Sequence, residues 1–430
     1  MTAERPVLLV GYSRYLYSEL CRFLPGRSLV LVEEPDAARK GKVHEVVEAA
    51  VLIEDEYLRP GGADSFFLRH RDLDPAMVLP GHDYAVPVVA RLAEHYGLPG
   101  AGQGAAQVLR DKRLTRVVSS AVGIANPVSR SVDSPAEIAA LWAETGGPLI
   151  LKPANRQGAI GTRVIRDRAE IDAAWRECTA DAAEAEHCLP EREVERRMLA
   201  EQLITGPEFS VEMLVRQGRR VFGNVTEKAL YQGPRPVEQG HCVPARIPAG
   251  LAGLLLTQTE RLLAAVAFGT GIVHCEWIVH DGVPYLVECA ARLPGDYIPE
   301  LIKGAYDFDV LRAYADLMRG GVPAVPAVPS APVRAAVSWH GHAEPGVVVA
   351  IDGAEEAAAL PGVQTCRVMV KPGEMVNPLR SSWDRTAVVT AFAPSAAAAL
   401  ETARRAIATI EITTTPASAH TVNPDYQTVA

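Results

Sequence analysis

The chain has 430 residues, a formal net charge of −9, and 48% apolar and 22% charged residues; its length predicts about two to four domains of a soluble globular protein. The acidic balance argues against a nucleic-acid or anionic-membrane partner, which would need a basic face, and no apolar run approaches the ~20 residues of a membrane span. Seven cysteines without CxxC spacing, and a start (residues 1–10) that is not a signal peptide, predict reduced thiols and a cytoplasmic location.

Strand-like and helix-like runs alternate over residues 1–105. The run at 6–11 (PVLLVG) predicts a strand, and residues 15–23 predict the helix that follows it. Such alternation predicts a small N-terminal α/β domain. GYSRYL lacks the GxGxxG spacing, so it does not indicate a dinucleotide site. The remaining elements expected here are strands at 29–32, 50–53 and 76–79 and a helix at 91–96.

Residues 106–320 predict a larger α/β unit, with a smaller lobe at about 125–205. Ser134 and Pro135 are typical of a helix start, and the sequence PLILKPANRQGAIGTRVI at 148–165 predicts strand, glycine loop, strand. The polar segment 181–197 predicts a solvated helix or a mobile insertion. Strands separated by turns are expected over 198–230. The remaining expected elements are a strand at 125–128, a hairpin at 272–289, and helices at 112–122, 135–145, 169–177, 251–268 and 310–319.

A Pro-rich linker at 320–332 (GGVPAVPAVPSAP) separates a C-terminal domain, residues 330–415, from the rest. Residues 416–430 are polar and terminal, and we expect them to be disordered. The expected elements of the C-terminal domain are strands at 333–340, 346–351, 363–370 and 386–392 and a helix at 396–410.

The most informative segment is the hairpin IVHCEWIVHDGVPYLVECAAR. Glu276 and Glu288 are the only acids inside its strands, and a carboxylate in a core-facing strand is costly unless it is paired or bound to a cation. A two-residue turn would place these acids on opposite faces, whereas a three-residue turn would place them on one face. We interpret the hairpin as having the odd-length turn, so that Glu276 and Glu288 form a Mg²⁺ platform. Arg292, just beyond it, would hold an anion beside the metal.

Two further segments suit a nucleotide. Lys152 ends an apolar strand before a loop that contains Gly158 and Gly161, a combination that suits polyphosphate. The segment AEQLITGPEFSVE adds a strand, a Gly-Pro turn and several acids, where strand-end backbone groups and a carboxylate can contact adenine and ribose. Taken alone, each of these segments is also typical of an ordinary exposed turn or strand edge.

The ordered motifs DKRLTR, LILKP, EQLITGPEFSVE, HCEW and VECAARLPGD, over about residues 80–320, resemble the ATP-grasp superfamily. VTEKAL, GHCVPA and RLPGDYIPEL resemble its carboxylate–amine ligases, which include the L-amino-acid (dipeptide) ligases. The resemblance implies an α/β (α+β ATP-grasp) fold with an N-terminal α/β domain, a two-lobed ATP-grasp core and a small α+β lid-like C-terminal domain.

The resemblance also implies ATP and Mg²⁺ as cofactors, with one or two metal ions and with Mn²⁺ able to substitute. The implied ATP-binding residues are Lys112, Lys152, Gly158, Gly161, Glu201, Gln202, Ile204, Glu208 and Lys228. The implied metal ligands are Glu276 and Glu288, the substrate-facing residues are Arg292, Gly295, Asp296 and His241, and the catalytic residues are Arg292, Lys152 and His274.

One position departs from the pattern of many ATP-grasp enzymes, Glu-x-Asn-x-Arg. Here Ala290 stands where the Asn would be a further metal ligand. We hypothesise that His274, on the face of Glu276 and opposite Ala290, fills this space and faces the substrate. On the other side of the hairpin, Cys275 and Cys289 would face each other as buried reduced thiols.

The implied reaction activates the carboxylate of an amino acid or related acid as an acyl phosphate, with release of ADP, and joins it to an amine. The sequence does not single out a base for the amine; His241, His274, Glu212 and Asp296 are candidates. Two alternatives stand beside this function: a biotin-carboxylase-like or related enzyme that activates bicarbonate, and a nucleotide-binding protein that has lost catalysis. The expected partners are a small-molecule carboxylate and amine, with a second copy of the chain in a homodimer.

Overall fold

The computed structural model describes residues 5–24, 28–48, 50–180, 188–192, 194–320 and 328–416. The expected disordered tail, apart from residue 416, lies outside the described residues, as do most of the expected linker and residues 181–187 of the polar segment. The described part of that segment, 188–192 and 194–197, contains no helix. Within the described ranges, no helix has the length and apolar character needed to cross a membrane.

The N-terminal domain is a four-stranded parallel sheet in the order β3-β2-β1-β4, as its alternating pattern predicted. Ser13 caps α1 by accepting from the backbone N–H of Leu16. Because β2 and β4 lie on opposite sides of β1, the carboxyl ends of β1 and β4 form the switch point of the sheet, where ligand sites of α/β folds lie. The elements are β1 (Val7–Val10), α1 (Arg14–Phe23), β2 (Leu29–Glu33), α2 (Pro35–Lys40), α3 (Val43–Val46), β3 (Ala50–Glu54), α4 (Gly62–Arg69), β4 (Met77–Pro80) and α5 (Val86–His95).

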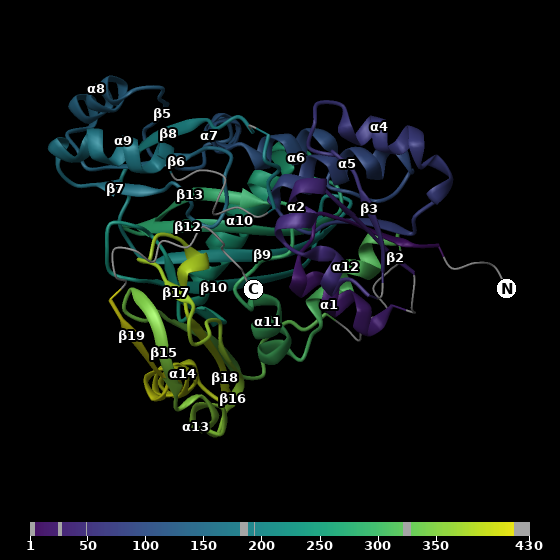
Figure 1. Ribbon diagram of the computed structural model, residues 1–430. Coiled ribbons are helices and arrows are strands. Elements are labelled where there is room, and N and C mark those ends of the chain that lie inside the picture. Colours follow the sequence, from purple (N-terminus) through teal and green to yellow (C-terminus); the bar gives the residue numbers. More distant parts are fainter. Residues whose placement is uncertain are drawn as a thin grey trace.

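The smaller lobe is an antiparallel sheet in the order β5-β8-β6-β7, packed against α8 and α9. It lies at the top left of Figure 1, away from the N-terminal domain. Two helices, α6 (Gln103–Arg110) and α7 (Lys112–Ala121), lead into it from the N-terminal domain. Its elements are β5 (Ser129–Ser131), α8 (Pro135–Thr145), β6 (Leu149–Pro153), β7 (Arg163–Ile165), α9 (Ile171–Ala180) and β8 (Met198–Gln202).

An eight-stranded antiparallel sheet in the order β13-β12-β9-β10-β11-β14-β18-β16 forms the centre of the molecule. Its last three strands belong to the C-terminal segment, so that segment extends the core sheet, because β14 pairs directly with β11. The strands from the core are β9 (Glu208–Arg216), β10 (Arg219–Leu230), β11 (Glu238–Val243), β12 (Gly271–His280) and β13 (Val283–Ala290). The strands from the C-terminal segment are β14 (Ala335–Gly341), β16 (Val363–Val368) and β18 (Ala387–Ala393).

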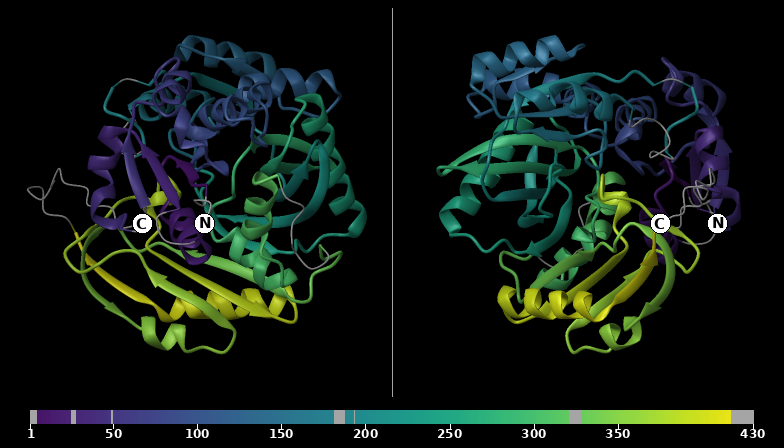
Figure 2. Two further views of the ribbon diagram at one scale, coloured as in Figure 1. Left: turned by 90° about the vertical axis from the view of Figure 1, so that its right-hand side faces the viewer. Right: turned by 60° about the vertical axis from the view of Figure 1, so that its left-hand side comes forward.

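Helices cover this sheet unevenly. The odd-numbered residues of β9 and β12, such as Val211 and Cys275, pack under α10 (Ala249–Ala265) in one apolar core. On the other face, α11 (Ile298–Tyr306) and α12 (Val310–Met318) share a core with the N-terminal sheet. This common core fixes the N-terminal domain against the large sheet, and the parts surround a common centre in Figure 2. The remaining elements are β15 (Gly346–Asp352), α13 (Ala354–Ala358), β17 (Met375–Val376), α14 (Ala396–Thr409) and β19 (Glu411–Thr415).

Beyond the shared core, most even-numbered positions of β9 and β12 carry polar side chains, among them His274 and Glu276 on β12. The register pairs Glu276 with Ser210, and Glu208 with Lys228. The row continues from Lys228 to His241 on β11 and to Ser338 on β14. One face of the sheet therefore carries a polar stripe that runs from the core into the C-terminal segment.

Candidate active site

Glu276 and Glu288 are opposite each other in the β12–β13 hairpin. The two acids lie on one face of the hairpin, as expected, but the prediction of an odd-length turn is wrong. His280 pairs with Val283, so the turn is the two residues Asp281 and Gly282. A break in register between Glu276 and Trp277 leaves Val287 as an extra residue in β13, and this β-bulge brings the acids together. The Val287 carbonyl accepts a hydrogen bond from Arg116 at 2.8 Å.

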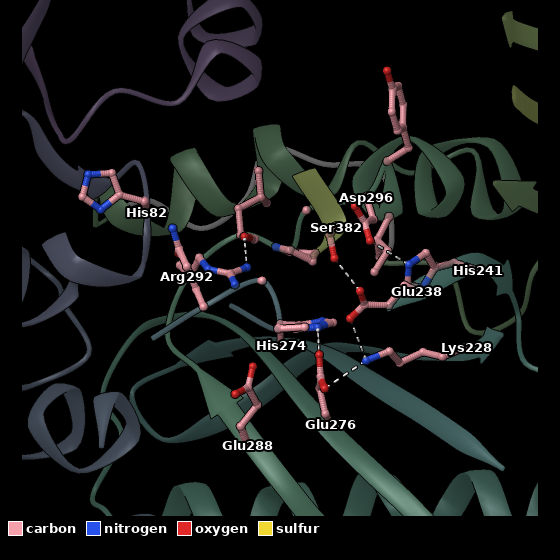
Figure 3. A pocket seen from close by; sticks show the side chains of 18 of the residues that line it. His82, Lys228, Glu238, His241, His274, Glu276, Glu288, Arg292, Asp296 and Ser382 are labelled. Atoms are coloured by element: carbon pink, nitrogen blue, oxygen red, sulfur yellow. Dashed lines mark hydrogen bonds and ion pairs between the residues drawn. The ribbon is translucent and has the colours of Figure 1, made fainter. Parts of the chain in front are cut away.

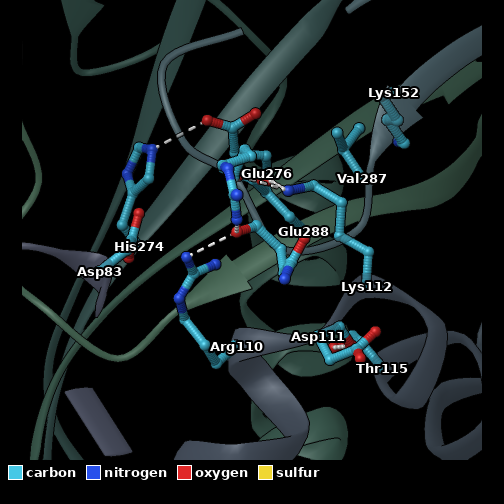
Figure 4. Close-up of polar contacts among 12 residues, drawn as sticks. Asp83, Arg110, Asp111, Lys112, Thr115, Lys152, His274, Glu276, Val287 and Glu288 are labelled. Atoms are coloured by element: carbon cyan, nitrogen blue, oxygen red, sulfur yellow. Dashed lines mark hydrogen bonds and ion pairs between the residues drawn. The ribbon is translucent and has the colours of Figure 1, made fainter. Parts of the chain in front are cut away.

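Each of the two carboxylates has a lysine beside it. Lys112 Nζ is 2.7 Å from Glu288, and Lys228 Nζ is 2.9 Å from Glu276. Burial by itself would raise the pKa of Glu276, but Lys228 and His274 hold it well below its usual range. Both contacts can be followed in the close-up views, Lys112 in Figure 4 and Lys228 in Figure 3. Glu276 is thus held in its ionised form, and carboxylate oxygens are the donors that Mg²⁺ prefers.

Among the described residues, no group of three or more His, Cys, Asp or Glu side chains is arranged to hold a metal ion. The opposed carboxylates of Glu276 and Glu288 fit two ligand positions of a Mg²⁺ ion, whose other ligands usually come from phosphate and water.

His274 lies opposite Ala290, as expected, and its ring is held between two carboxylates. Nδ1 is 3.0 Å from Glu212 and Nε2 is 3.1 Å from Glu276. Burial would lower the pKa of His274, but its hydrogen bonds to Glu212 and Glu276 raise it to about 9. His274 is thus a fixed cation beside the acid pair.

Lys152 and Arg116 converge on Glu201. Lys152 Nζ is 2.6 Å from one carboxylate oxygen, and Arg116 donates to both oxygens at 2.7 and 3.1 Å. Burial would raise the pKa of Glu201, but Arg116 and Lys152 lower it to about 2. The carboxylate expected to contact adenine is therefore occupied by two cations in this structure.

The other residues expected around the nucleotide line one cavity, which is described below. The backbone N–H of Gln202 donates to Val128, and Ile204 follows at the end of β8. Burial raises the pKa of Glu208 to about 7, against the opposing effect of Lys228. Lys228 is also 3.4 Å from Glu238, which was not expected in the site.

Gly158 and Gly161 both have φ of +65°, a conformation that favours glycine. A side chain at Gly158 would come within 3.1 Å of Trp383 from the C-terminal segment. The glycine loop therefore lies against the C-terminal segment at the cavity.

Arg292 forms a two-pronged ion pair with Asp83 of the N-terminal domain, at 2.9 and 3.0 Å. Burial would raise the pKa of Asp83, but Arg292 and Arg110 lower it to about 2. Asp83 follows the end of β4, so an anion from the switch point of the N-terminal sheet orients the arginine of the core.

Asp296, after the exposed Gly295, joins His241 to the C-terminal segment. Its Oδ2 is 3.1 Å from His241 Nε2 and 3.0 Å from an Arg385 nitrogen, and Arg385 also donates to Oδ1. Burial would raise the pKa of Asp296, but Arg385 and His241 hold it well below its ordinary value.

These residues surround a single cavity of about 880 Å³. Contacts continue without a break from His274 through Glu276, Lys228 and Glu238 to Ser382, as Figure 3 shows. The N-terminal domain, both lobes of the core and the C-terminal segment all contribute side chains. The predicted site residues that line it are Lys112, Lys152, Gly158, Glu201, Gln202, Ile204, Glu208, Lys228, His241, His274, Glu276, Glu288, Arg292, Gly295 and Asp296; Gly161 adjoins this wall in the glycine loop.

The sequence interpretation missed five charged or polar residues of the site: Asp83, Arg116, Glu238, Ser382 and Arg385. Two of them carried a local signal. Asp83 lies in the loop shortly after the strand expected at 76–79, and Arg116 lies one helical turn after Lys112, on the same helix face. Nothing near Ser382 or Arg385 in the sequence relates them to the site.

Comparison with known families gives two matches along the chain. Residues 145–300 match the ATP-grasp domain, and residues 341–415 match the L-amino acid ligase C-terminal domain 2. Residues 145–300 are thus an ATP-grasp domain. Its C-terminal residues match a domain type named for the L-amino acid ligases.

Three similar proteins match a larger part of the chain. An uncharacterized protein, y4rH, of Sinorhizobium fredii is 28% identical over 356 residues, which cover 81% of this chain and 70% of that one. Carnosine synthase 1 of Gallus gallus is 25% identical over 303 residues, 66% of this chain, but the match spans only 32% of that longer protein. The crystal structure of an L-amino acid ligase from Bacillus licheniformis has a TM-score of 0.77 at 18% identity, covering 96% of this chain and 100% of that one. At this identity, the structural match shows a shared fold.

Proposed function

We propose that this protein is an ADP-forming carboxylate–amine ligase, which activates an amino acid or related acid as an acyl phosphate and joins it to an amine. The observation that carries the proposal is the opposed pair Glu276 and Glu288, with Lys112 and Lys228 beside it and Arg292 lining the same cavity. Such a set suits phosphoryl transfer, in which catalysis is mostly positioning and charge stabilisation. The L-amino acid ligase type of C-terminal domain supports an amino acid as the acid.

In this proposal the phosphates of ATP lie between the acid pair and the lysines. Lys112 and Lys228 exchange their contacts with Glu288 and Glu276 for contacts with phosphate oxygens, which neutralises charge on the transferred group. Mg²⁺, held by Glu276 and Glu288, supplies further charge stabilisation when it is bound. Burial lowers the pKa of Lys152, and Glu201, its buried counterion, opposes that effect.

Arg292 has the geometry to hold the substrate carboxylate and the later oxyanion. Its Nε and one terminal nitrogen bind Asp83, and its remaining terminal nitrogen donates to the Leu293 carbonyl at 3.0 Å. Asp83 therefore fixes the plane of the guanidinium at the cavity wall, and a fixed donor stabilises developing charge without reorganisation.

The acyl phosphate must be kept from water. The glycine loop next to Trp383 and the C-terminal segment at the cavity wall support that role, since exclusion of water suppresses hydrolysis of reactive intermediates.

The test is a screen of ADP and phosphate release over pairs of amino acids, with ATP and Mg²⁺, in which the products are identified by mass. We expect release that requires both an acid and an amine, and a product heavier than the acid by the amine minus water. Hydroxylamine in place of the amine should give the hydroxamate of the activated acid. Release that depends on bicarbonate and is indifferent to amines, or ATP binding without turnover over the whole panel, would contradict the proposal.

A further inference from the structure

Joining an amine to an acyl phosphate requires a group that accepts a proton from the attacking nitrogen. The sequence leaves four candidates for this group. In the structure, two of them already use their polar atoms in hydrogen bonds or ion pairs within the protein. Glu212 has no exposed surface and accepts hydrogen bonds from Ser210, Asn224 and Thr226 as well as contacting His274. His274 lies between Glu212 and Glu276, and both of its ring nitrogens are in use.

Asp296 is engaged as well. Arg385 binds both of its oxygens, and His241 lies against one of them. An ionised carboxylate held by a bidentate arginine is a poor base, because proton uptake would break its strongest contacts. Three of the four candidates are therefore engaged, and His241 remains.

The contact between His241 and Asp296 decides which ring nitrogen carries the proton. Asp296 is ionised and can only accept, so Nε2 of His241 carries the hydrogen that it donates. In the uncharged ring Nδ1 then keeps its lone pair; this atom is buried, and among the described residues it has no hydrogen-bond partner. A histidine that lines a substrate cavity, with one nitrogen fixed by a carboxylate and the other unpartnered, has the arrangement of a general base and its orienting group.

Arg385 fixes the carboxylate in turn. It is buried, and besides Asp296 it donates to the backbone carbonyl of Ser382 at 2.7 Å and to that of Glu238 at 3.2 Å. These contacts tie its guanidinium to the turn before β18 and to β11, the strand that carries His241. Arg385 thus belongs to the C-terminal segment but sets the position of an acid in the core.

Two other titratable groups lie near His241, a lysine in ion pairs and a buried histidine whose ring nitrogens have no hydrogen-bond partner among the described residues. Lys228, its neighbour on β10, binds Glu276 and Glu238. His340, on β14, stays uncharged, because burial and the nearby Arg385 hold its pKa well below the ordinary value. The cation next to His241 and Asp296 is therefore Arg385, and Asp296 neutralises it.

We propose that His241 is the catalytic residue that takes the proton from the attacking amine, and that Arg385 of the C-terminal segment is a positioning residue that acts through Asp296. This inference rests on the proposed carboxylate–amine ligase function.

The proposed step balances as follows. The amine enters as the free base, and its lone pair forms the C–N bond to the carbonyl carbon of the acyl phosphate. The C–O bond to phosphate breaks, and phosphate leaves with that electron pair. The surplus proton on nitrogen passes to Nδ1 of His241, which later releases it to water while Nε2 remains bonded to Asp296.

The test compares two nucleophiles. Hydroxylamine is largely unprotonated at neutral pH and acts without a strong base, whereas the amine of an amino acid depends on one. His241→Gln keeps a donor for Asp296 but has no titrating base. With the acid and amine found in the screen of amino-acid pairs, we expect this variant to lose amide formation at least about 100-fold, the scale of general-base catalysis, while it still forms hydroxamate. The pH dependence of its residual amide formation should then follow only the protonation of the amine substrate.

Each outcome separates this inference from the proposed function. If the wild-type protein forms neither hydroxamate nor amide, the ligase function itself fails. If wild type forms both, the inference is overturned by a His241→Gln variant that forms amide at the wild-type rate, or by one that loses hydroxamate and amide equally. His44→Gln removes an exposed histidine outside the cavity and is the matched control.

The positioning role of Arg385 is tested by removing its positive charge. Arg385→Met should lower kcat for amide formation at least about tenfold with little change in hydroxamate formation, and Arg385→Lys should restore part of the loss. Because Arg385→Met leaves Asp296 buried without a cation, the double variant Arg385→Met/Asp296→Asn serves as a folded reference in thermal unfolding. Arg59→Met, which removes an exposed arginine paired with Glu56, is the control. Wild-type amide formation in a folded Arg385→Met protein would overturn the positioning role.

Discussion

Glu276 and Glu288 are direct cross-strand neighbours, although the two-residue turn between their strands would by itself place them on opposite faces. Val287 shifts the register so that the two acids share one face. It is the extra residue of a β-bulge, and its carbonyl accepts from Arg116, the residue that also binds Glu201. The bulge thus aligns the acid pair. It also connects the pair to α7, whose Arg116 binds Glu201, the counterion of Lys152.

Removing either acid of this pair should weaken the response to metal. We expect Glu276→Gln and Glu288→Gln each to raise the Mg²⁺ concentration needed for ADP formation on the order of 10–100-fold, since even outer contacts of metal sites have effects of that size. A Mg²⁺ titration of ADP release measures this. Glu260→Gln, at an exposed pair with Arg220, is the control. An unchanged Mg²⁺ requirement in both variants would contradict the proposed platform.

The contact between Asp83 and Arg292 predicts a kinetic effect of the N-terminal domain. Asp83→Asn removes the anion that fixes the guanidinium, and we expect kcat for ADP formation to fall roughly 100-fold, as misplacement of about 1 Å can cause. Affinity for ATP should change little, because Arg292 is expected to bind the acid. Steady-state kinetics with a separate ATP-binding measurement distinguishes these effects, with Asp74→Asn at an exposed pair as control. A selective loss of ATP affinity would count against the assignment.

The buried triad of Arg116, Lys152 and Glu201 predicts a large stability effect. Arg116→Met removes one counterion of a carboxylate that is 1% exposed. We expect the free energy of unfolding to fall by about 3–5 kcal/mol, the cost of breaking a buried ion pair. Arg130→Met at an exposed pair should cost less than about 1 kcal/mol. Urea unfolding of both variants checks the contrast, and equal effects would show that Glu201 does not depend on Arg116.

Glu201 also predicts a pH dependence. Its pKa is lowered from 4.5 to about 2 in the folded protein, so the unfolded chain binds the proton more tightly. The stabilisation is present above pH 4.5 and is lost as the pH falls towards 2; for a shift of this size it amounts to about 3 kcal/mol. Unfolding free energies measured over this interval should fall less steeply for Glu201→Gln than for the wild type. Parallel curves would mean that Glu201 titrates alike in both states.

His274 is expected to matter for both stability and turnover. His274→Ala leaves Glu212 buried without its cation, so we expect a loss of about 3 kcal/mol or more in the free energy of unfolding. Turnover should fall as well, because Glu276 loses a partner that holds its carboxylate. Unchanged turnover, together with unchanged constants for both substrates, would contradict a role of His274 in the site.

The sequence by itself predicted the local elements and the chemistry of their residues. Helix 135–145 coincides with α8, which begins at Pro135 as expected, although Ser134 at the N-cap position makes no side-chain capping hydrogen bond. The alternating N-terminal domain folds as a parallel sheet, and the face shared by His274 and Glu276 follows from the two-residue period of a strand. Such features depend on neighbours along the chain, so they can be read from it.

Only the tertiary structure decided which charges meet. Val287 could not be recognised as a bulge, because a bulge depends on how the partner strand packs. Asp83 and Arg385 lie 209 and 89 residues from their partners Arg292 and Asp296. Ion pairs over such separations form where packed domains bring side chains together. They therefore cannot be predicted from the spacing of residues along the chain. The sequence therefore supplied the acids and bases of the candidate site. The packing of the N-terminal and C-terminal parts against the core sheet decided which of these groups form contacts. It also left some, such as Nδ1 of His241, without a partner among the described residues.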